Sequence, residues 1–348
     1  MSELAAALLP WFQRHGRHDL PWQQDANPYR VWVSEIMLQQ TQVTTVIPYF
    51  RRFVERCPDT RALAEAPLDR VLHLWTGLGY YARARNLHRA AAIIVQDYGG
   101  CLPADPDCLT ALPGIGRSTA GAILALGYGR RAAILDGNVK RVLARYYGIH
   151  GWPGHREVEK KLWALAERET PQQDIAAYTQ AIMDLGATVC TRAGPRCADC
   201  PLATGCYARR HNEQQQLPTA RSRRVLPVRR AVFALLENEQ GEILLQQRPP
   251  SGVWGGLWSL PEYPSQTELA DWIERRALLL SETLTPLPQI RHSFSHFHLD
   301  ITPVRAVIRE RADTIRDNDA CLWYSPVQAA EVGLPAPVQA LLKNFKRL

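Results

Sequence analysis

Apolar side chains recur with two different periods along this chain. Over the first 150 residues they lie three or four positions apart, which is the spacing of amphipathic helices. Glycine, proline and cap residues divide this part into predicted helices at 1–17, from Pro28 onwards, and at 48–57, 68–75, 83–98, 107–112, 118–128 and 139–147. The first 150 residues are therefore expected to be all-α.

After residue 230 the apolar period shortens to that of β-strands. Strands are predicted at 231–236, 242–247 and 299–308, with a Gln240-Gly241 turn between the first two, and helices at 267–280 and 338–345. This part is expected to form a separate α+β domain.

Charge singles out the segment between these two regions. The chain has a formal charge of +7, and residues 208–230 carry seven arginines against one glutamate, with two prolines and three consecutive glutamines. Such a run is typical of an extended, mobile linker, and a phosphate-binding arm is the second interpretation. Arginine forms forked contacts with phosphate, so the arginine excess favours a nucleic-acid partner for the whole protein.

Length and hydropathy limit the remaining classes. With 348 residues the chain is expected to hold about two domains. No apolar run approaches the ~20 residues of a membrane span, and the first 17 residues lack the basic segment and cleavage site of a signal peptide. A cytoplasmic protein without a membrane partner is therefore expected.

A glycine-rich turn and an aspartate provide the first candidate site. Gly114 and Gly116 lie directly before a predicted helix, where missing Cβ atoms and free amide groups suit a phosphate. Asp136 stands at the head of the helix at 139–147, which Gly148 can cap, and the helix dipole favours its ionised form. An ordinary glycine turn with an N-cap aspartate explains these residues equally well.

A second carboxyl lies on an earlier helix. Asn27 and Pro28 suit its N-cap and first position, and Glu35 lies beside its apolar side. Apolar surroundings favour a neutral carboxyl, which a general acid requires, although an exposed surface glutamate is the more frequent case. The glutamines around Gln40 suit base edges or a polar helix end. The glycine turn with Tyr80 suits base stacking or a core anchor.

Four of the eight cysteines lie within 17 residues, with the spacing C-x6-C-x2-C-x5-C: Cys190, Cys197, Cys200 and Cys206. Disulfides are not expected in a chain without an export signal. Zinc sites usually use two C-x2-C pairs, and here there is only one. The spacing therefore favours a 4Fe-4S cluster, with zinc as the alternative.

Together these features resemble a known family. The glycine turn, Asp136 and the cysteine loop are similar to those of helix-hairpin-helix DNA glycosylases related to endonuclease III, over the first 207 residues. Three further motifs resemble the MutY family of adenine DNA glycosylases: Ser-Glu-Ile-Met-Leu-Gln-Gln-Thr-Gln-Val at 34–43, Gly-Leu-Gly-Tyr-Tyr-Ala-Arg at 77–83, and Phe-Ser-His at 294–296. The resemblance covers essentially the full chain.

The resemblance implies an α-helical catalytic region followed by an α+β domain. Residues 1–207 would form the catalytic region, with a six-helix barrel at about 22–132 and a cluster domain built from 1–21 and 133–207. Residues 208–230 would be a basic linker, and 231–348 a Nudix-like domain that reads the base opposite the adenine. The glutamates that hold magnesium in a Nudix box are missing after Ile273-Glu274-Arg275-Arg276-Ala277-Leu278, so nucleotide hydrolysis is not expected.

The resemblance also implies a reaction, which is hydrolysis of the N-glycosidic bond of adenine opposite 8-oxoguanine or guanine, after the adenine is flipped out of the duplex. Glu35 would protonate adenine at N7, and an ionised Asp136, with Asn138 nearby, would stabilise the oxocarbenium-like sugar. The remaining implied site residues are Leu20, Trp22 and Gln180 in the adenine pocket, Gln40 and Tyr80 as wedges in the base stack, Ser295 and His296 against the opposite base, and Gly114, Gly116, Arg192 and Arg196 on phosphates.

One position separates this family from its bifunctional relatives, which carry a lysine nucleophile where this chain has Ser118. A hydroxyl cannot form a Schiff base with the sugar, so a monofunctional enzyme, acting as a monomer, is expected, with Lys140 as a phosphate contact. Two alternatives remain. A lyase acting on oxidised pyrimidines is disfavoured by Ser118 and by the extra domain, and a redox-responsive DNA-binding protein has no need for Glu35 with Asp136.

Overall fold

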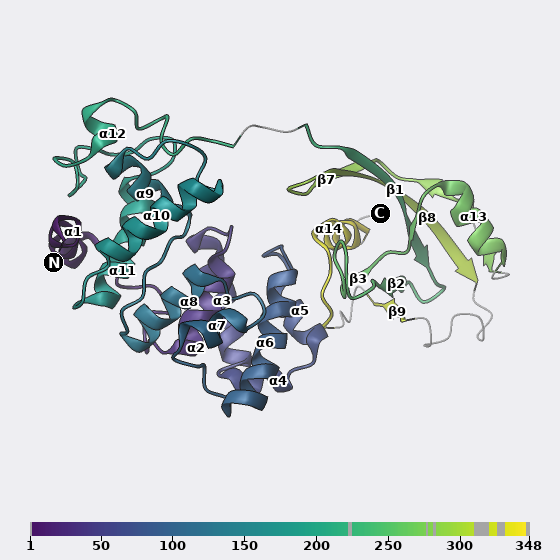
Figure 1. Ribbon diagram of the computed structural model, residues 1–348. Helices are drawn as coiled ribbons and strands as arrows, with labels where there is room; N and C mark the ends of the chain where they lie inside the picture. The colour runs from purple at the N-terminus through teal and green to yellow at the C-terminus, as the bar shows by residue number, and fades with distance from the viewer. Residues whose placement is uncertain are drawn as a thin grey trace. The chain divides into compact units, whose positions relative to one another are not determined.

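The chain divides into two compact units (Figure 1). The computed structural model describes residues 2–221, 225–275, 278–280, 283–309, 320–325 and 331–345. The first unit, here called the helical unit, comprises Met1–Glu65 and Asn86–Arg223. The second, the sheet unit, comprises Ala66–Arg85 and Arg224–Leu348, so it includes a stretch from the N-terminal part of the chain.

The helical unit contains only helices and connecting segments among its described residues. Its helices are α1 (Glu3–His15), α2 (Pro28–Leu38), α3 (Val43–Arg56), α4 (Thr60–Glu65), α6 (Ala82–Tyr98, which begins in the sheet unit), α7 (Pro106–Ala111), α8 (Arg117–Ala122), α9 (Gly137–Tyr147), α10 (Arg156–Glu169), α11 (Ile175–Asp184) and α12 (Tyr207–Arg210). Two π-helical segments, η1 (Ile123–Gly127) and η2 (Leu185–Val189), continue α8 and α11. The prediction of an all-α N-terminal part is confirmed.

Local sequence determines where several of these helices begin and end. The Asn27 side chain accepts a hydrogen bond from the Arg30 amide at 2.9 Å and caps α2. Asp136 caps α9 in the same way, through the Val139 amide at 2.8 Å. Gly148 ends α9 with a φ of +67°, a left-handed conformation that favours glycine. Both ends of α9 were predicted, and Asp136 is held at a fixed position as a result.

The apolar face of α1 joins the first residues to the later helices. Leu4 and Leu8 are fully buried, and they share one core with Leu143 of α9, Leu162 of α10 and Ile182 of α11. Burying a leucine side chain contributes about 1.5–3 kcal/mol, so α1 is firmly attached. The predicted N-terminal surface helix therefore covers the part of the chain that carries Asp136.

The sheet unit contains a mixed sheet whose centre is a parallel pair, β1 and β8 (Figure 1). The strands are β1 (Val228–Glu237), β2 (Ile243–Gln247), β3 (Trp258–Ser259), β4 (Glu262–Tyr263), β5 (Leu279–Leu280), β6 (Thr285–Pro286), β7 (Ile290–Ser293), β8 (His298–Arg309) and β9 (Cys321–Tyr324), and the helices are α5 (Leu68–Trp75), α13 (Gln266–Arg275) and α14 (Ala336–Phe345). The main strand order is β3-β2-β1-β8-β5, and β1 pairs with β8 from Val228↔His298 to Glu237↔Val307. The prediction of an α+β domain is confirmed.

Two predicted elements have different bounds in the structure. The helix expected at 267–280 ends at Arg275, and Leu279–Leu280 pair with β8 instead. Arg276 and Ala277 lie outside the described residues. The helix expected to begin at Pro48 begins at Val43 and keeps Pro48 in its interior. Pairing with a distant strand decides the first difference, which the local periodicity does not show.

The predicted linker is extended in only part of its length. α12 reaches into it, and Leu217 is 1% exposed, with its carbonyl bound by Arg145 Nε at 2.8 Å. Residues 222–224 lie outside the described ranges, and β1 begins at Val228. The prediction of an extended, mobile segment is therefore wrong for residues 211–218, which form turns and bends and bury the Leu217 side chain.

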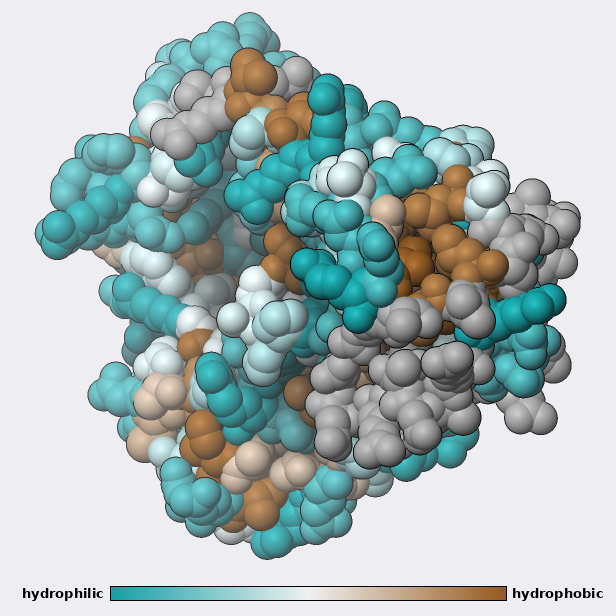
Figure 2. Space-filling view, turned by 90° about the vertical axis from the view of Figure 1, so that its right-hand side faces the viewer, coloured by the Kyte–Doolittle hydropathy of each residue, from teal (hydrophilic) through white to brown (hydrophobic). Residues whose placement is uncertain are grey.

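The face of the molecule drawn in Figure 2 is mainly hydrophilic. Figure 2 shows a face on which hydrophobic residues gather in small groups between polar ones. The large hydrophobic side chains that are exposed in the described ranges are Leu68, Tyr80, Trp152, Val225, Val228 and Leu280. Among the helices of this described part, none is long and apolar enough to cross a membrane.

Candidate active site

The helical unit contains an open cavity of about 780 Å³ near the end of α2 and the starts of α8 and α9. Eight residues predicted for the active site are among those that line it: Leu20, Trp22, Glu35, Gln40, Ser118, Asp136, Asn138 and Gln180. They come from separate segments of the chain, so the fold brings them together. The cavity is therefore the candidate active site.

Glu35 lies on α2 between the buried residues Ser34 and Ile36. Burial raises the pKa of Glu35 to about 8, and the negative charge of Asp136 adds to this shift. No side chain or amide in the described part of the chain donates a hydrogen bond to the Glu35 carboxyl. Glu35 is therefore mainly protonated at pH 7, as a general acid must be.

Asp136 has the same cavity around it but a different set of partners. Burial raises the pKa of Asp136, while hydrogen bonds from Val139 N–H and the Asn138 side chain, at 2.8 and 3.1 Å, lower it. The amide groups at the start of α9 therefore lower the pKa of Asp136, as predicted, but the increase caused by burial is larger. Since Glu35 lacks such donors, a proton shared by the two carboxyls resides preferentially on Glu35.

Asn138 is fixed by an arginine that sequence reasoning missed. Arg141 Nη2 donates to Asn138 Oδ1 at 2.8 Å, and its Nε donates to the Cys190 carbonyl at 2.7 Å. A chain of hydrogen bonds therefore runs from Asp136 through Asn138 and Arg141 to the cysteine loop. The spacing of three positions between Asn138 and Arg141 on one helix was the available signal.

Gln180 is oriented by a second group of residues that sequence reasoning missed. Its Nε2 donates to Asp184 Oδ1 at 2.8 Å, and Asp184 is fully buried. Asp184 also accepts from the Arg17 amide at 2.7 Å and pairs with the Arg17 guanidinium at 2.6 Å. A buried carboxylate needs such partners, so Arg17 and Asp184 fix the amide of Gln180 at the cavity.

Leu20 and Trp22 form an apolar wall of the cavity, and each is 5% exposed. Trp22 meets the Phe50 ring edge-on with 5.4 Å between ring centres. Gln40, by contrast, is exposed and has a φ of +60°, which is uncommon for a residue other than glycine. Backbone strain of this kind is often kept at functional sites.

The two glycines of the turn have different roles. Gly114 has a φ of +81°, and a Cβ there would lie 2.9 Å from the Asn86 side chain. Gly116 is the N-cap of α8, and a Cβ built on it would meet nothing within 4 Å. Gly114 is therefore required by the fold, whereas Gly116 leaves an open approach to the helix start.

Ser118 and Lys140 are both occupied by protein groups. The Leu135 amide donates to Ser118 Oγ at 2.9 Å, which fixes the backbone just before Asp136. Lys140 Nζ pairs with Glu159 at 2.6 Å. Neither side chain stands free in the cavity as a nucleophile would.

The three remaining residues that were predicted to contact bases, Tyr80, Ser295 and His296, belong to the sheet unit. Tyr80 is 50% exposed and has a φ of +49° in its glycine turn. Ser295 and His296 are exposed on the turn between β7 and β8, which the Phe294 amide closes by donating to the Phe297 carbonyl at 2.9 Å. These residues are therefore accessible to a large ligand.

The four predicted ligand cysteines, Cys190, Cys197, Cys200 and Cys206, line one small cavity together with Arg145. Burial raises the pKa of Cys200 to about 12, and the neighbouring thiols add to the shift. Arg145 is 3% exposed and its Nη1 lies 3.3 Å from Cys190 Sγ. Within the described ranges, no three His, Cys, Asp or Glu side chains are placed to hold a single metal ion. Arg192 and Arg196 are exposed on the same loop.

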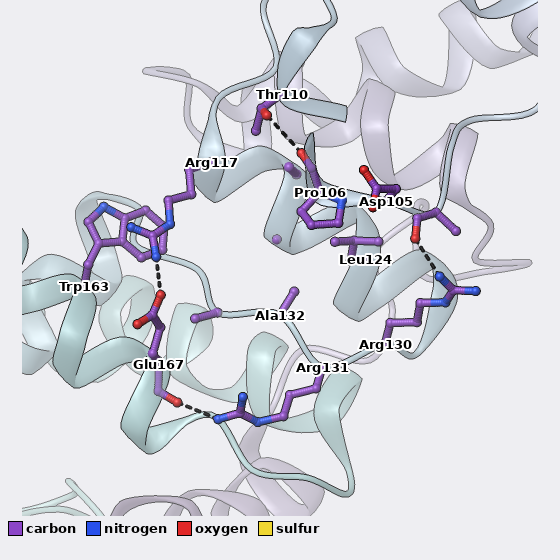
Figure 3. Close-up of a pocket in the computed structure, with 14 residues that line it drawn as sticks. Asp105, Pro106, Thr110, Arg117, Leu124, Arg130, Arg131, Ala132, Trp163 and Glu167 are labelled. Carbon is purple, nitrogen blue, oxygen red and sulfur yellow. Dashed lines mark hydrogen bonds and ion pairs between the residues drawn. The ribbon is translucent and has the colours of Figure 1, made fainter. Parts of the chain in front are cut away.

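A second pocket of the helical unit, of about 540 Å³, lies on the other face of α8 (Figure 3). Arg117 lies over the Trp163 ring, 3.9 Å from its centre, and pairs with Glu167. Arg131 donates to the Glu167 carbonyl at 2.7 Å. Both arginines contact residues of α10. Their contacts across the pocket therefore join α8 and the segment around Arg131 to α10.

Comparison with known proteins assigns both parts of the chain. Residues 33–168 match the HhH-GPD superfamily of base excision DNA repair proteins, and residues 231–344 match the NUDIX domain. The chain is 38% identical to the adenine DNA glycosylase of Buchnera aphidicola subsp. Acyrthosiphon pisum, over 98% of its own length and 97% of the relative's. The chain belongs to the adenine DNA glycosylase family.

The human adenine DNA glycosylase is 37% identical, over 86% of this glycosylase and 66% of the human chain. The solved structure of a thermostable thymine-DNA glycosylase matches 60% of this chain and 95% of its own, with a TM-score of 0.54 and 27% identity. The predicted family, the helix-hairpin-helix and Nudix-like fold class, and the activity of a base excision repair glycosylase are confirmed.

Proposed function

We propose that this glycosylase hydrolyses the N-glycosidic bond of adenine paired with 8-oxoguanine or guanine in double-stranded DNA. The observation that carries the proposal is that Glu35 and Asp136 line one cavity, and that among the described residues hydrogen-bond donors reach the carboxyl of Asp136 but not that of Glu35. Cleavage of a glycosidic bond needs a proton for the leaving group and a negative charge near the sugar. Because the bond is inaccessible in the base stack, the adenine is flipped into the cavity.

In the first step Glu35 gives its proton to N7 of adenine, so that the base leaves neutral when the bond to the sugar breaks. Its pKa of about 8 keeps this proton available at pH 7. Asp136 stabilises the positive charge that develops on the sugar, and Asn138 fixes its carboxylate through the hydrogen bond at 3.1 Å. Glu35, now ionised, then takes a proton from the attacking water.

Adenine recognition follows from the orientation of Gln180. Its Nε2 is engaged by Asp184, which leaves its Oε1 as an acceptor for the exocyclic amino group of adenine. Guanine presents an oxygen at that position and would leave the acceptor without a donor. Leu20 and Trp22 supply the apolar wall on which the flipped ring packs.

Base reading on the opposite strand is assigned to four exposed residues. Gln40 and Tyr80 fill the space left in the stack, and their positive φ values reflect tight turns that aim the side chains outward. Ser295 and His296 contact the base opposite the adenine. Gly116, Gly114, Arg192 and Arg196 bind the phosphates, which position the duplex but do not read its sequence.

The cysteine loop fits a 4Fe-4S cluster as its cofactor. The four cysteines line one cavity, and the buried guanidinium of Arg145 lies 3.3 Å from Cys190 Sγ, where it can donate to a ligand sulfur. Bound there, the cluster would stabilise the loop that carries Arg192 and Arg196. Hydrolysis requires no electron transfer, so its role is structural.

A monofunctional enzyme acting as a monomer in the cytoplasm is the simplest form of this proposal. Ser118 Oγ is engaged by Leu135, and the amine of Lys140 by Glu159. No Schiff base with the sugar is therefore expected.

Incubation with a labelled duplex holding one A:8-oxoguanine pair tests the function. Abasic product that breaks only after alkali supports it, strand breaks without alkali indicate a lyase, and binding without product would contradict an enzymatic role on this pair. An otherwise identical duplex with a T:A pair is the control.

A further inference from the structure

We propose that Arg85 is a positioning residue for recognition of the base opposite the adenine. Its guanidinium binds the loop that supports the Phe294-Ser295-His296 turn and thereby fixes this turn relative to the segment that carries Tyr80. The inference rests on the proposed reading of 8-oxoguanine by this turn and by Tyr80. All the residues on which it is built belong to the sheet unit.

Arg85 lies in the first turns of α6, five positions after Tyr80. Its Nη1 donates to the carbonyl of Gly255 at 2.6 Å across 170 residues of sequence. The side chain is partly buried, and burial lowers its pKa. Among the described residues, no carboxylate pairs with Arg85, so the bond to Gly255 is its main polar contact.

The loop that Arg85 binds has a well-defined conformation. Trp254 is 9% exposed and has a φ of +55°, which only tight surroundings maintain in a residue with a large side chain. A Cβ on Gly255 would lie 2.6 Å from the Pro250 carbonyl oxygen, so no other residue fits there. The Gly256 amide donates back to the Pro249 carbonyl at 3.0 Å. Movement of Gly255 would therefore move Trp254.

Trp254 in turn supports the reading turn. Its ring centre lies 5.2 Å from that of Phe294 and 5.4 Å from that of His292. Phe294 stacks on Phe297 with 4.5 Å between ring centres, and the exposed Ser295 directly follows Phe294 in the chain. The contacts run without a break from Arg85 to the residues beside Ser295.

The segment that carries Tyr80 is docked on the same domain at two further points. Tyr81 Oη donates to the Leu334 carbonyl at 2.8 Å, and this bond is buried. Asp69 accepts from Trp258 Nε1 at 3.2 Å and from Gln247 Nε2 at 3.3 Å. These bonds hold the segment on the domain, while Arg85 joins the segment to the loop whose Trp254 contacts the turn.

The first test replaces Arg85 by methionine, which keeps the length of the side chain but removes its donors. Arg89→Met is the matched control, since Arg89 lies one turn further along α6, is exposed, and in the described part of the chain forms a side-chain hydrogen bond with Asn86 alone. Single-turnover excision is measured for the full chain on A:8-oxoguanine and A:G duplexes. The ratio of the two rates should fall about tenfold in Arg85→Met, with the A:G rate within about twofold of wild type.

Two further variants separate positioning from general destabilisation. Arg85→Lys keeps one donor for the Gly255 carbonyl and should restore part of the ratio. Ser295→Ala added to Arg85→Met should lower the ratio little further, because both changes act through one turn. Thermal unfolding is followed for each variant, and equal loss on both duplexes would mean a structural role and overturn the proposal.

An unchanged ratio in Arg85→Met would also overturn it. A wild-type protein that shows no preference between the duplexes would instead contradict the proposed reading of 8-oxoguanine. The two failures are therefore distinguishable in one set of measurements.

Discussion

The cavity of the helical unit and the reading turn of the sheet unit use polar side chains in opposite ways. In the cavity, burial shifts the pKa values of Glu35 and Asp136, and this shift makes acid catalysis possible near pH 7. On the turn, Ser295 and His296 are exposed, and the stacked rings of the neighbouring Phe294 and Phe297 hold the turn in place. In the proposed function, the chemistry therefore depends on burial of the two carboxyls, whereas recognition of the opposite base depends on accessible groups held in place.

This difference predicts that the two regions fail differently. Damage to the cavity should slow excision from every duplex by a similar factor. Damage to the turn should affect only the duplex that carries the oxidised base. The following predictions test this separation.

The largest effect is expected from Glu35→Gln. The amide keeps the size of the side chain but cannot protonate adenine, so excision should fall by at least ~10²–10⁴ on both A:8-oxoguanine and A:G. Duplex binding should remain. Single-turnover rates and a binding titration check this, with the exposed Glu55→Gln on α3 as the control. Near-normal excision would mean that Glu35 is not the acid.

Replacing Ser295 and His296 together by alanine is expected to lower the preference for 8-oxoguanine by roughly 5- to 150-fold, which is the range for loss of one good base contact. The A:G rate should change little, because the cavity is unaffected. The measurement is the ratio of excision rates at one salt concentration. A parallel loss on both duplexes would contradict the separation.

The pH profile should show the protonation states of the two carboxyls. Glu35 acts in its protonated form, so the single-turnover rate should fall about tenfold per pH unit above its pKa of about 8. Asp136 acts ionised and its pKa is raised, so the acid limb should lie above the usual aspartate range. Glu35→Gln should lose the alkaline limb. A rate independent of pH between 7 and 10 would be incompatible with this assignment.

The smallest effect is expected from Arg192→Ala, since Arg192 is exposed and is proposed to supply one phosphate contact. The slope of log K against log salt should decrease by about 0.9, equally for matched and mismatched duplexes. Arg192→Lys keeps the charge and should keep the slope. A change in base preference would show that Arg192 reads sequence.

Much of the fold follows from local sequence. The helix at 68–75 and the caps at Asn27, Asp136 and Gly148 were predicted because each depends on a few adjacent residues. The end of the helix expected at 267–280 and the packing of Leu217 were not, because a strand partner and a buried surface far along the chain decide them.

The same limit applies to the candidate site. Motifs indicated Glu35 and Asp136, the family resemblance indicated Gln180, and all three line one cavity in the structure. Asp184, which binds Gln180, and Arg141, which acts on Asp136 through Asn138, carry no motif of their own, and their bonds to distant segments appear only in the folded chain. The inclusion of residues 66–85 in the sheet unit likewise has no signal in the local pattern.

That inclusion has a consequence for the order in which the protein is made. Arg85 and Tyr81 leave the ribosome 170 and 253 residues before their partners Gly255 and Leu334. At about 5–20 residues per second, the segment waits roughly 10–50 s before the surface that receives it exists. During this time Arg85 and Tyr81 lack these two native hydrogen bonds. Residues 66–85 therefore gain their last native hydrogen bond only when Leu334 has emerged, and an earlier stop in translation leaves Tyr81 without it.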